Sequence, residues 1–476
     1  MASQPICAGM VCVYFTQNNL ISICVFGYYG AICTGNFVLI SNHNHGLYEE
    51  VISISKGLVS RAKQVLSPVL SHFFEIEIEK GEGCYLMDFQ GNAYLDFAAG
   101  VGVASTGHCH PKVVKAIQTQ SQILIHACAG IVYYEPNIAL AEKIGSCLDG
   151  DLSSFFFTQS GTEAVEAAIK LAKFVSKKTD VITFKGGFHG RTLGALSITS
   201  SKESYRVGYD PLLPQVEFFP FPYEYRNPWD AGDCKSAAIK AFKAFIEPNK
   251  EHVCAVIIEP ILGEGGYVPA PPEFLNELND ICKEHHIFLI LDEIQTGFGR
   301  TGKWMAYQHE TFTPDILVMA KGIASGMPLG AVVSRPDIMD QWTAGAHGGT
   351  YTGNPVSCAA GLATIDVIEE VLPGVSSLGD HAIEFLRDAL ADHPYVGDIR
   401  GKGLMIGIEF VTDKSSKAPY LDIIKPIMNA CLDQFLIVIS CGVHQNVIRL
   451  VPPLIIEKEM LMKGLKILVS ENNAHR

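Results

Sequence analysis

The stretch PEFLNELNDICKEHHIFLILDEI, residues 272–294, shows the pattern that decides the fold. Its first part, residues 272–285, spaces apolar side chains as an amphipathic helix does. Its second part, IFLILDEI (287–294), is a short apolar run that ends in two acids. Such a run is typical of a strand buried on both faces of a parallel sheet. A helix that leads directly into a strand of this kind indicates an α/β fold.

The same alternation extends from about residue 155 to residue 335. Because helix-like stretches lie between several strand-like runs, the sequence predicts a large domain with a mostly parallel sheet covered by helices. Ligands bind outside the carboxyl ends of the strands in such sheets, and Glu259, Asp292 and Lys321 fall at those ends. The further strand-like runs are FFFTQSG (155–161), VITFKGG (181–187), VCAVIIEP (253–260), DILVMAKG (315–322) and LGAVVSR (329–335), and the further helix-like stretches are 162–174 and 235–246.

The C-terminal part has a different pattern and predicts a smaller α+β domain. A hairpin system at residues 76–98 is expected to join it. Helices are expected near 354–371, 380–391, 419–434 and 456–469, with strand-like runs at 403–410, 436–442 and 447–454. The domain limits that we predict are an atypical N-terminal extension at 1–55, the N-terminal part of the small domain at 56–105, the large domain at 106–372 and the C-terminal small domain at 373–476.

Composition excludes several classes of protein. With 36 Lys and Arg against 50 Asp and Glu, the formal charge is −14, and no basic block suggests nucleic-acid binding. The 14 cysteines are scattered without a C-x-x-C pair, so we expect reduced thiols and a cytoplasmic protein. The triplet HCH (108–110) lacks a second ligand cluster, and we therefore expect no metal.

The first 55 residues differ from the rest of the chain. They contain no Lys or Arg, so neither a secretory signal nor a mitochondrial presequence fits them. Their apolar runs are shorter than the roughly 18 residues that a membrane span needs, and no membrane association is expected. We interpret this segment as an extension outside the catalytic fold.

Lys321 follows the apolar run at residues 316–320 and has two interpretations. A lone lysine at the end of a strand most often extends to water. A desolvated lysine with suitable neighbours is instead a nucleophile that forms Schiff bases with carbonyl compounds. The residues expected at the other strand ends decide between these two interpretations.

Three motifs provide such neighbours. TQSGTEA (158–164) places Ser160, Gly161 and Thr162 at the start of a helix, which is either an ordinary cap or a phosphate site. In LDEIQTGFGRTG (291–302), Asp292 follows an apolar strand and is expected to need a cationic partner, such as a protonated pyridine nitrogen. GGFHGRT (186–192) adds aromatic faces from Phe188 and His189, with Arg191 for a carboxylate. Together with Lys321, these groups predict a pyridoxal-phosphate site.

From about residue 66 onward the chain resembles the class III pyridoxal-phosphate aminotransferases, which include the 4-aminobutyrate, acetylornithine and ornithine enzymes. The resemblance implies fold type I, with the cofactor pyridoxal 5'-phosphate. The motifs that carry it are LDFAAGVGVASTGHCHP (95–111), SGTEA (160–164), FHGRT (188–192), IIEPILGEGG (257–266), LDEIQTGFGRTGKW (291–304), MAKGIASGMPLGA (319–331), GGTYTGNP (348–355) and IRGKGLMIG (399–407).

The resemblance also implies roles for single residues. Lys321 would hold the cofactor as a Schiff base and move the proton, and Asp292 would keep the pyridine nitrogen protonated. Gln295 would bond the ring hydroxyl, and Phe188 would stack on the ring. Gly161 and Thr162 would bind the phosphate, with Thr350 reaching it from the neighbouring subunit of a homodimer with shared sites. Ser160, His189 and Glu259 are expected beside them.

The substrate residues implied by the resemblance are two arginines and a glutamate. Arg191 would bind the far carboxylate of an ω-amino acid, and Arg400 the α-carboxylate of 2-oxoglutarate. Glu264 would pair with Arg400 whenever the amino donor has no carboxylate there. Val101 and Tyr134 are expected to line the pocket, and Leu262 stands where the family commonly has Gln.

The predicted function is a ping-pong transamination from an ω-amino acid to 2-oxoglutarate. The first candidate donor is 4-aminobutyrate, with acetylornithine or ornithine as other candidates. The alternative is an amino-acid racemase or epimerase on the same scaffold. A non-catalytic binding protein is disfavoured, because Lys321 and Asp292 are both present.

Overall fold

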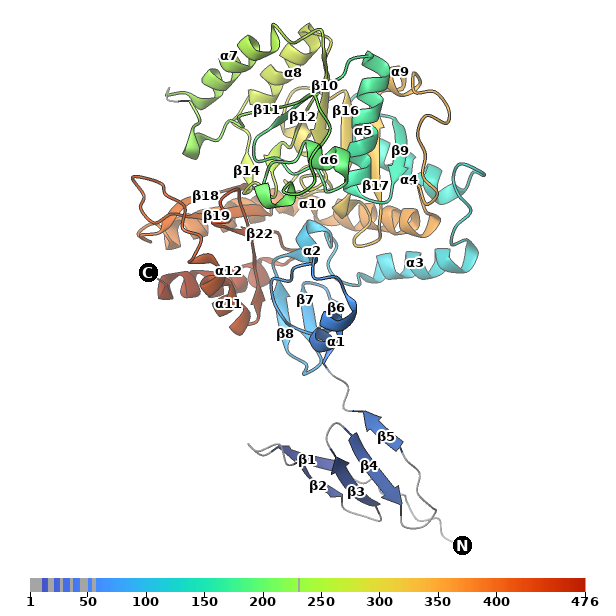
Figure 1. The fold of residues 1–476 in the computed structure, drawn as a ribbon, viewed down its shortest axis with the longest axis vertical. Coiled ribbons are helices and arrows are strands. Elements are labelled where there is room, and N and C mark those ends of the chain that lie inside the picture. The colour runs from blue at the N-terminus through green and yellow to red at the C-terminus, as the bar shows by residue number, and fades with distance from the viewer. Residues whose placement is uncertain are drawn as a thin grey trace. The chain divides into compact units, whose positions relative to one another are not determined.

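The computed structural model describes residues 57–229 and 232–475, and before them the backbone of five strands within residues 11–53 (Figure 1). The chain divides into two compact units, Met1–Glu77 and Ile78–Arg476. The domain limits expected from the sequence stay predictions.

The first unit contains short antiparallel strands. Strands β1 (Val11–Phe15) and β2 (Ile21–Val25) pair with each other, and β4 (Phe37–Asn42) pairs with both β3 (Tyr29–Thr34) and β5 (Glu50–Ser53). Helix α1 (Leu58–Val65) follows them.

The second unit is built on a seven-stranded sheet in the order β11-β10-β12-β15-β16-β17-β9. Strands β11, β10, β12, β15 and β16 pair in parallel, whereas β17 pairs antiparallel with both of its neighbours. The prediction of a mostly parallel sheet is therefore confirmed. The bounds are β9 Ser154–Thr158, β10 Asp180–Phe184, β11 Val216–Phe219, β12 Val253–Ile258, β15 Phe288–Asp292, β16 Ile316–Met319 and β17 Gly330–Ser334.

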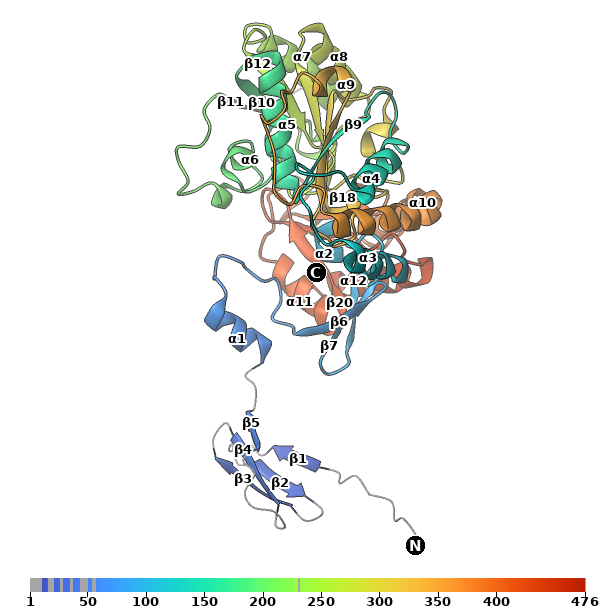
Figure 2. The same ribbon diagram turned by 90° about the vertical axis from the view of Figure 1, so that its right-hand side faces the viewer.

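Helices cover this sheet because its strands have apolar side chains on both faces. Every residue of β12 is buried, and so is every residue of β16. The Ala-rich helix α5 (Gly161–Ser176) contacts β12, β16 and β17, and its alanines allow a close approach. Helices α7 (Cys234–Ile246) and α8 (Phe274–Glu284) pack against each other, and α8 also contacts β15 (Figure 2).

Two four-stranded sheets and the C-terminal helices form the smaller part, which agrees with the α+β domain expected from the sequence. One has the order β18-β19-β22-β21 and the other β20-β8-β7-β6. Strand β20 (Leu436–Ile437) pairs with β8 (Ala93–Asp96), so the predicted hairpin system at residues 76–98 does join the C-terminal part. The remaining bounds are β6 Ile78–Glu82, β7 Tyr85–Asp88, β18 Val396–Lys402, β19 Met405–Phe410, β21 Ile439–Cys441, β22 Val447–Leu450, α11 Ile424–Asp433 and α12 Lys458–Ala474.

The prediction of two separate helices near 354–371 and 380–391 is wrong. A single helix, α10 (Pro355–Ala389), runs through Pro373. Residues on both sides of this proline are buried, among them Ile368 and Val375, while Pro373 itself is exposed. The packing of both halves therefore stabilises a helix that the proline alone would interrupt. Both views place α10 at the boundary between the seven-stranded sheet and the C-terminal elements (Figures 1 and 2).

Three findings on the described part of the chain concern membrane helices, metal ligands and thiols. None of its helices is long and apolar enough to cross a membrane. Its acidic, histidine and cysteine side chains form no cluster suited to a metal ion. The ten cysteines whose side chains are described are all free thiols. The cytoplasmic location stays a prediction.

Candidate active site

Lys321 lies directly beyond β16, at the carboxyl edge of the sheet, in a short 3-10 turn (Lys321–Ile323). Its φ of 45° is in the left-handed region, a strain that commonly marks functional sites. The ammonium is partly buried and makes no hydrogen bond or ion pair with the described residues. Burial, with Arg449 nearby, lowers the pKa of Lys321 to about 8, although Glu259, Asp292 and Glu264 oppose the shift. Lys321 therefore has the lowered pKa that a Schiff-base nucleophile needs, and its catalytic role stays a prediction.

Asp292, the last residue of β15, is buried beside His189. Its Oδ2 lies 2.7 Å from His189 Nδ1, and its Oδ1 accepts a hydrogen bond from the Ile294 amide at 3.1 Å. Burial alone would lower the pKa of His189, but the hydrogen bond and charge of Asp292, together with Glu259, raise it. Asp292 is therefore fixed in one orientation at the edge of the sheet next to Lys321.

Glu259 follows β12 and ties two loops to this edge. Its carboxylate accepts hydrogen bonds from the backbone amides of Phe188 and Gly263, each at 2.8 Å. Burial raises the pKa of Glu259 to about 7, with Asp292 adding to the shift and His189 opposing it. The aromatic ring of Phe188 is thereby held on a fixed loop.

The predicted phosphate residues lie at the N-terminus of α5. Ser160 is the N-cap residue, and its hydroxyl accepts a hydrogen bond from the Glu163 amide. Gly161 and Thr162 begin the helix, and Thr162 Oγ1 lies 2.7 Å from Thr192 Oγ1. Both the cap and the anion site were open interpretations. The structure shows the cap, and the partly exposed amides beyond it remain suited to an anion.

Gln295 has an unused acceptor. Its Nε2 donates to the Val101 carbonyl at 3.3 Å, but its buried Oε1 has no hydrogen-bond partner among the described residues. A Cβ on Gly263 would come within 2.4 Å of this oxygen, so a larger residue there would displace the Gln295 side chain. A buried acceptor without a donor is costly, and a hydroxyl on a bound ring would satisfy it.

These groups fit pyridoxal phosphate. The helix N-terminus at Ser160 to Thr162 would bind its phosphate, Phe188 would cover the ring, and Gln295 would accept from the ring hydroxyl. Asp292 would pair with the pyridine nitrogen, and Lys321 supplies the amine with a lowered pKa.

Arg191 lies exposed over an aromatic side chain. Its guanidinium carbon is 4.4 Å from the centroid of the Tyr205 ring and 6.0 Å from that of Phe188. Within the described ranges it forms no ion pair. An exposed guanidinium that is oriented by stacking, but has no anion, is suited to a carboxylate from outside the chain.

Glu264 pairs with Arg449, not with Arg400, which corrects the expected pairing. Its Oε2 is 3.0 Å from Arg449 Nη1, and its Oε1 is 2.6 Å from Lys202 Nζ and accepts from the Tyr205 hydroxyl at 3.1 Å. Burial would raise the pKa of Glu264, but Arg449 and Lys202 lower it. Glu264 is therefore ionised at neutral pH.

Arg400 belongs to a different ionic cluster. Its Nη1 lies 2.8 Å from Glu409 and 2.9 Å from Asp398, and its Nε and Nη2 donate to the Gly266 carbonyl. The side chain is buried, and its two carboxylates already neutralise it. The assignment of Arg400 to the α-carboxylate is therefore unsupported, because this guanidinium has no free charge to offer.

The remaining predicted residues, Val101, Tyr134 and Thr350, have fewer contacts with the groups described above. Val101, with a φ of 65°, contributes its carbonyl to Gln295. Tyr134 is buried and donates to the Gly353 carbonyl at 2.9 Å, close in sequence to Thr350. Thr350 is exposed in the single chain, and its predicted contact with a neighbouring subunit stays a prediction.

Sequence reasoning missed Arg449, Lys202 and Tyr205. Arg449 lies in β22 opposite Gly407, a residue without a side chain, and it is buried. A signal was available, since VIRLVPPL (447–454) contains one arginine within an apolar strand, and a buried charge needs a partner. No local pattern links Lys202 or Tyr205 to Glu264, because their positions depend on the loop after β10.

Comparison with known proteins identifies the family. Residues 67–471 match the family described as Aminotransferase class-III. Among curated relatives, the probable 4-aminobutyrate aminotransferase of Bacillus subtilis is 37% identical over 82% of this chain and 91% of its own length. The acetylornithine aminotransferase of Methanopyrus kandleri is 40% identical over 82% of this chain and 93% of its own length. The alanine/serine racemase of Pyrococcus horikoshii is 37% identical over 87% of this chain and 89% of its own length.

Solved structures agree with this assignment. A Bacillus anthracis aminotransferase matches with a TM-score of 0.83 and 30% identity, over 88% of this chain and 98% of that one. The ornithine aminotransferase of Toxoplasma gondii matches with a TM-score of 0.78 and 27% identity, over 87% and 94%. The chain therefore belongs to the class III aminotransferases and is a transaminase of fold type I that uses pyridoxal 5'-phosphate.

Proposed function

We propose that the chain transfers the amino group of an ω-amino acid to 2-oxoglutarate by a ping-pong mechanism, with 4-aminobutyrate as the first candidate donor. Acetylornithine and ornithine are the next candidates. The observation that carries the proposal is that two arginines differ in whether a carboxylate of the chain neutralises them. Arg191 has no anionic partner among the described residues, whereas Arg449 is paired with Glu264.

This difference suits substrates with one or two carboxylates. An ω-amino acid places a single carboxylate far from its amino group, and Arg191 would bind it while Glu264 neutralises Arg449. A 2-oxo diacid brings a second carboxylate, for which Glu264 must release Arg449. Lys202 and Tyr205 also bind Glu264, at 2.6 and 3.1 Å, so the released glutamate would keep two partners.

The chain's own residues would then perform the following roles. Lys321 Nζ, with its pKa lowered to about 8, accepts and returns the proton of the carbon that bears the amino group. Asp292, held by His189, would stabilise positive charge on the ring nitrogen, and Phe188 would limit the access of water to the ring. When bound, pyridoxal phosphate withdraws electrons from the reacting carbon and stores the amino group between the two half-reactions.

A racemase or epimerase is the second candidate. The observation that favours it is the relative named alanine/serine racemase, which is 37% identical over 428 residues. Racemisation needs the same lysine and the same ring, but no second carboxylate site.

We also propose a homodimer with shared active sites. Thr350 lies exposed in the single chain, and the neighbouring Tyr351 is 63% exposed. A site that borrows Thr350 from a second copy would give both residues a partner.

The test is to incubate the holoenzyme with single amino donors and to follow the cofactor's absorbance and the donor's chirality. Conversion to the pyridoxamine form by 4-aminobutyrate, followed by its reversal with 2-oxoglutarate, would support the proposed transamination. Loss of chirality in alanine or serine without net conversion would favour the racemase instead.

A further inference from the structure

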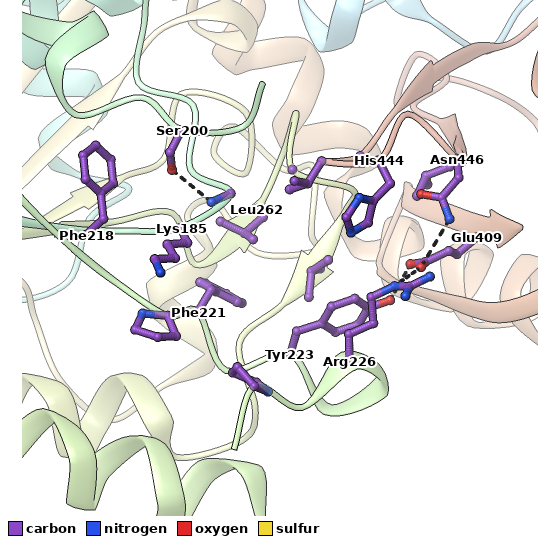
Figure 3. A pocket seen from close by; sticks show the side chains of 18 of the residues that line it. Lys185, Ser200, Phe218, Phe221, Tyr223, Arg226, Leu262, Glu409, His444 and Asn446 are labelled. Carbon is purple, nitrogen blue, oxygen red and sulfur yellow. Dashed lines mark hydrogen bonds and ion pairs between the residues drawn. The ribbon is translucent and has the colours of Figure 1, made fainter. Parts of the chain in front are cut away.

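A pocket in the described residues is separate from the site around Lys321. Its volume is about 570 Å³, which lies in the range of small-molecule sites, roughly 300–1,000 Å³. It lies between the loops that follow β10 and β11 and the C-terminal strands (Figure 3). None of the residues that we assign to the cofactor or the substrate lines it. Leu262 and Gly265, which are close to Glu264 in the sequence, line the pocket. Glu264 itself does not line it, because its carboxylate binds Arg449 and Lys202.

The walls of this pocket are mainly apolar. Figure 3 shows Phe218 and Phe221 on one side of it, and Leu262, Val443 and Val447 also line it. Phe221 is buried, and its ring is fixed edge-to-face against Phe184 at 6.1 Å. The pocket is therefore suited to a ligand with a ring-sized apolar body.

One end of the pocket is polar and has an unused donor. Arg226 Nε bonds Glu409 Oε1 at 2.5 Å, and the Tyr223 hydroxyl donates to Glu409 Oε2. Figure 3 shows both side chains directed toward Glu409. Arg226 Nη2 is buried, yet in the part of the chain that the structure describes it has no hydrogen-bond partner. A buried guanidinium nitrogen without an acceptor is costly, and an anion would satisfy it.

Positive charge also exceeds negative charge around this pocket. Lys185, Arg206 and Arg226 line it, whereas the only carboxylate on its described lining is Glu409, which Arg400 shares at 2.8 Å. Arg206 Nη1 donates to three backbone carbonyls, those of Leu196, Ser197 and Thr199, so no described carboxylate neutralises it. Charge complementarity therefore favours an anionic occupant.

We propose that this pocket is a second ligand site, which binds a small organic anion with its carboxylate at Arg226 and its apolar body between Phe218, Phe221 and Leu262. The inference does not rest on the proposed function, because binding at this site can be measured without turnover.

Calorimetric titration of the holoenzyme with 3-phenylpropionate, an aryl carboxylate of suitable size, tests the proposal. Val443 is at the rim, 45% exposed, so substitutions there are compatible with folding. Val443→Glu puts a like charge beside the ligand, and Val443→Gln is the neutral control of the same shape. We expect the parent and Val443→Gln to bind, and Val443→Glu to lose roughly tenfold or more in affinity. The neutral analogue 3-phenylpropionamide should bind more weakly.

Three results would overturn the proposal. The first is no binding of 3-phenylpropionate at millimolar concentration, and the second is equal affinity of the two Val443 variants. The third is that Arg449→Met abolishes binding of 3-phenylpropionate while Val443→Glu does not. The anion would then bind at Arg449, in the proposed substrate site. None of these results bears on whether the enzyme transaminates 4-aminobutyrate.

Discussion

At the scale of single residues, Lys321 experiences opposing effects. Burial and Arg449 disfavour its charged form, while Glu259, Asp292 and Glu264 favour it. Burial prevails and the pKa falls to about 8, so the reactive neutral amine is available near physiological pH, which an ordinary lysine does not achieve.

This lowered pKa predicts how the cofactor-free enzyme captures pyridoxal 5'-phosphate. The capture rate should rise roughly tenfold per pH unit while Lys321 is mostly protonated, and level off above about pH 8. Stopped-flow absorbance measures it, with Lys321→Ala as the background from other lysines. A rate that still climbs at pH 10 would show an ordinary lysine.

The pairing of Glu264 with Arg449 predicts a change in donor preference. In Glu264→Gln, Arg449 loses its charge partner when 4-aminobutyrate binds, whereas glutamate would bring its own carboxylate. A charge-assisted hydrogen bond contributes about 1.5–3 kcal/mol, so single-turnover rates should shift toward glutamate by roughly 10- to 150-fold.

The control for this prediction is Asp398→Asn. It removes a carboxylate from Arg400 rather than from Arg449, and should leave donor preference unchanged. Equal losses of single-turnover rate for both donors in Glu264→Gln would contradict the exchange of partners at Arg449. A change in donor preference in Asp398→Asn would show that Arg400 binds the substrate carboxylate after all.

At the scale of elements, α10 shows how packing decides where small residues are required. A Cβ on Gly374 would meet nothing within 4 Å, while a Cβ on Gly379 would lie 2.1 Å from the Gly403 carbonyl oxygen. Both glycines lie in the same helix, so their intrinsic helix propensity is the same.

Alanine at these two positions should therefore have opposite effects on stability. We expect Gly374→Ala to stabilise the protein by about 0.5–1 kcal/mol, because alanine favours a helix. Gly379→Ala should destabilise it by about 1–3 kcal/mol, because the helix must move away from Gly403. Thermal unfolding of the holoenzyme measures both, and shifts in the same direction would contradict this account.

At the scale of the whole molecule, the proposed sharing of sites predicts complementation. Lys321→Ala removes the amine, and Thr350→Glu should repel the phosphate from the neighbouring site. Each homodimer should be inactive. In a mixed dimer one site would combine an intact Lys321 with an intact Thr350, so co-expression should restore about a quarter of the parent activity. If the co-expressed variants remain inactive, Thr350 contributes to the active site of its own chain and not to that of its neighbour.

The sequence by itself determined the central sheet and the residues at its edge. Continuous apolar runs such as VCAVIIEP and IFLILDEI predict buried parallel strands, since few other structures bury both faces of so short a segment. Because parallel strands end at one edge, Glu259, Asp292 and Lys321 had to lie near one another, and the structure places them there. A local sequence pattern suffices to predict the place of a side chain whenever the position and direction of its strand determine where that side chain lies.

Only the tertiary structure decided which charges pair. Glu264 and Arg449 are 185 residues apart, the difference of their numbers, and meet because β22 faces the loop after β12. Arg400 looked equivalent in the sequence, but Glu409 on the neighbouring strand β19 already neutralises it. Likewise, α10 continues through Pro373 because residues on both sides are buried. Ion pairs and packing join distant segments, and no local period specifies which segments meet.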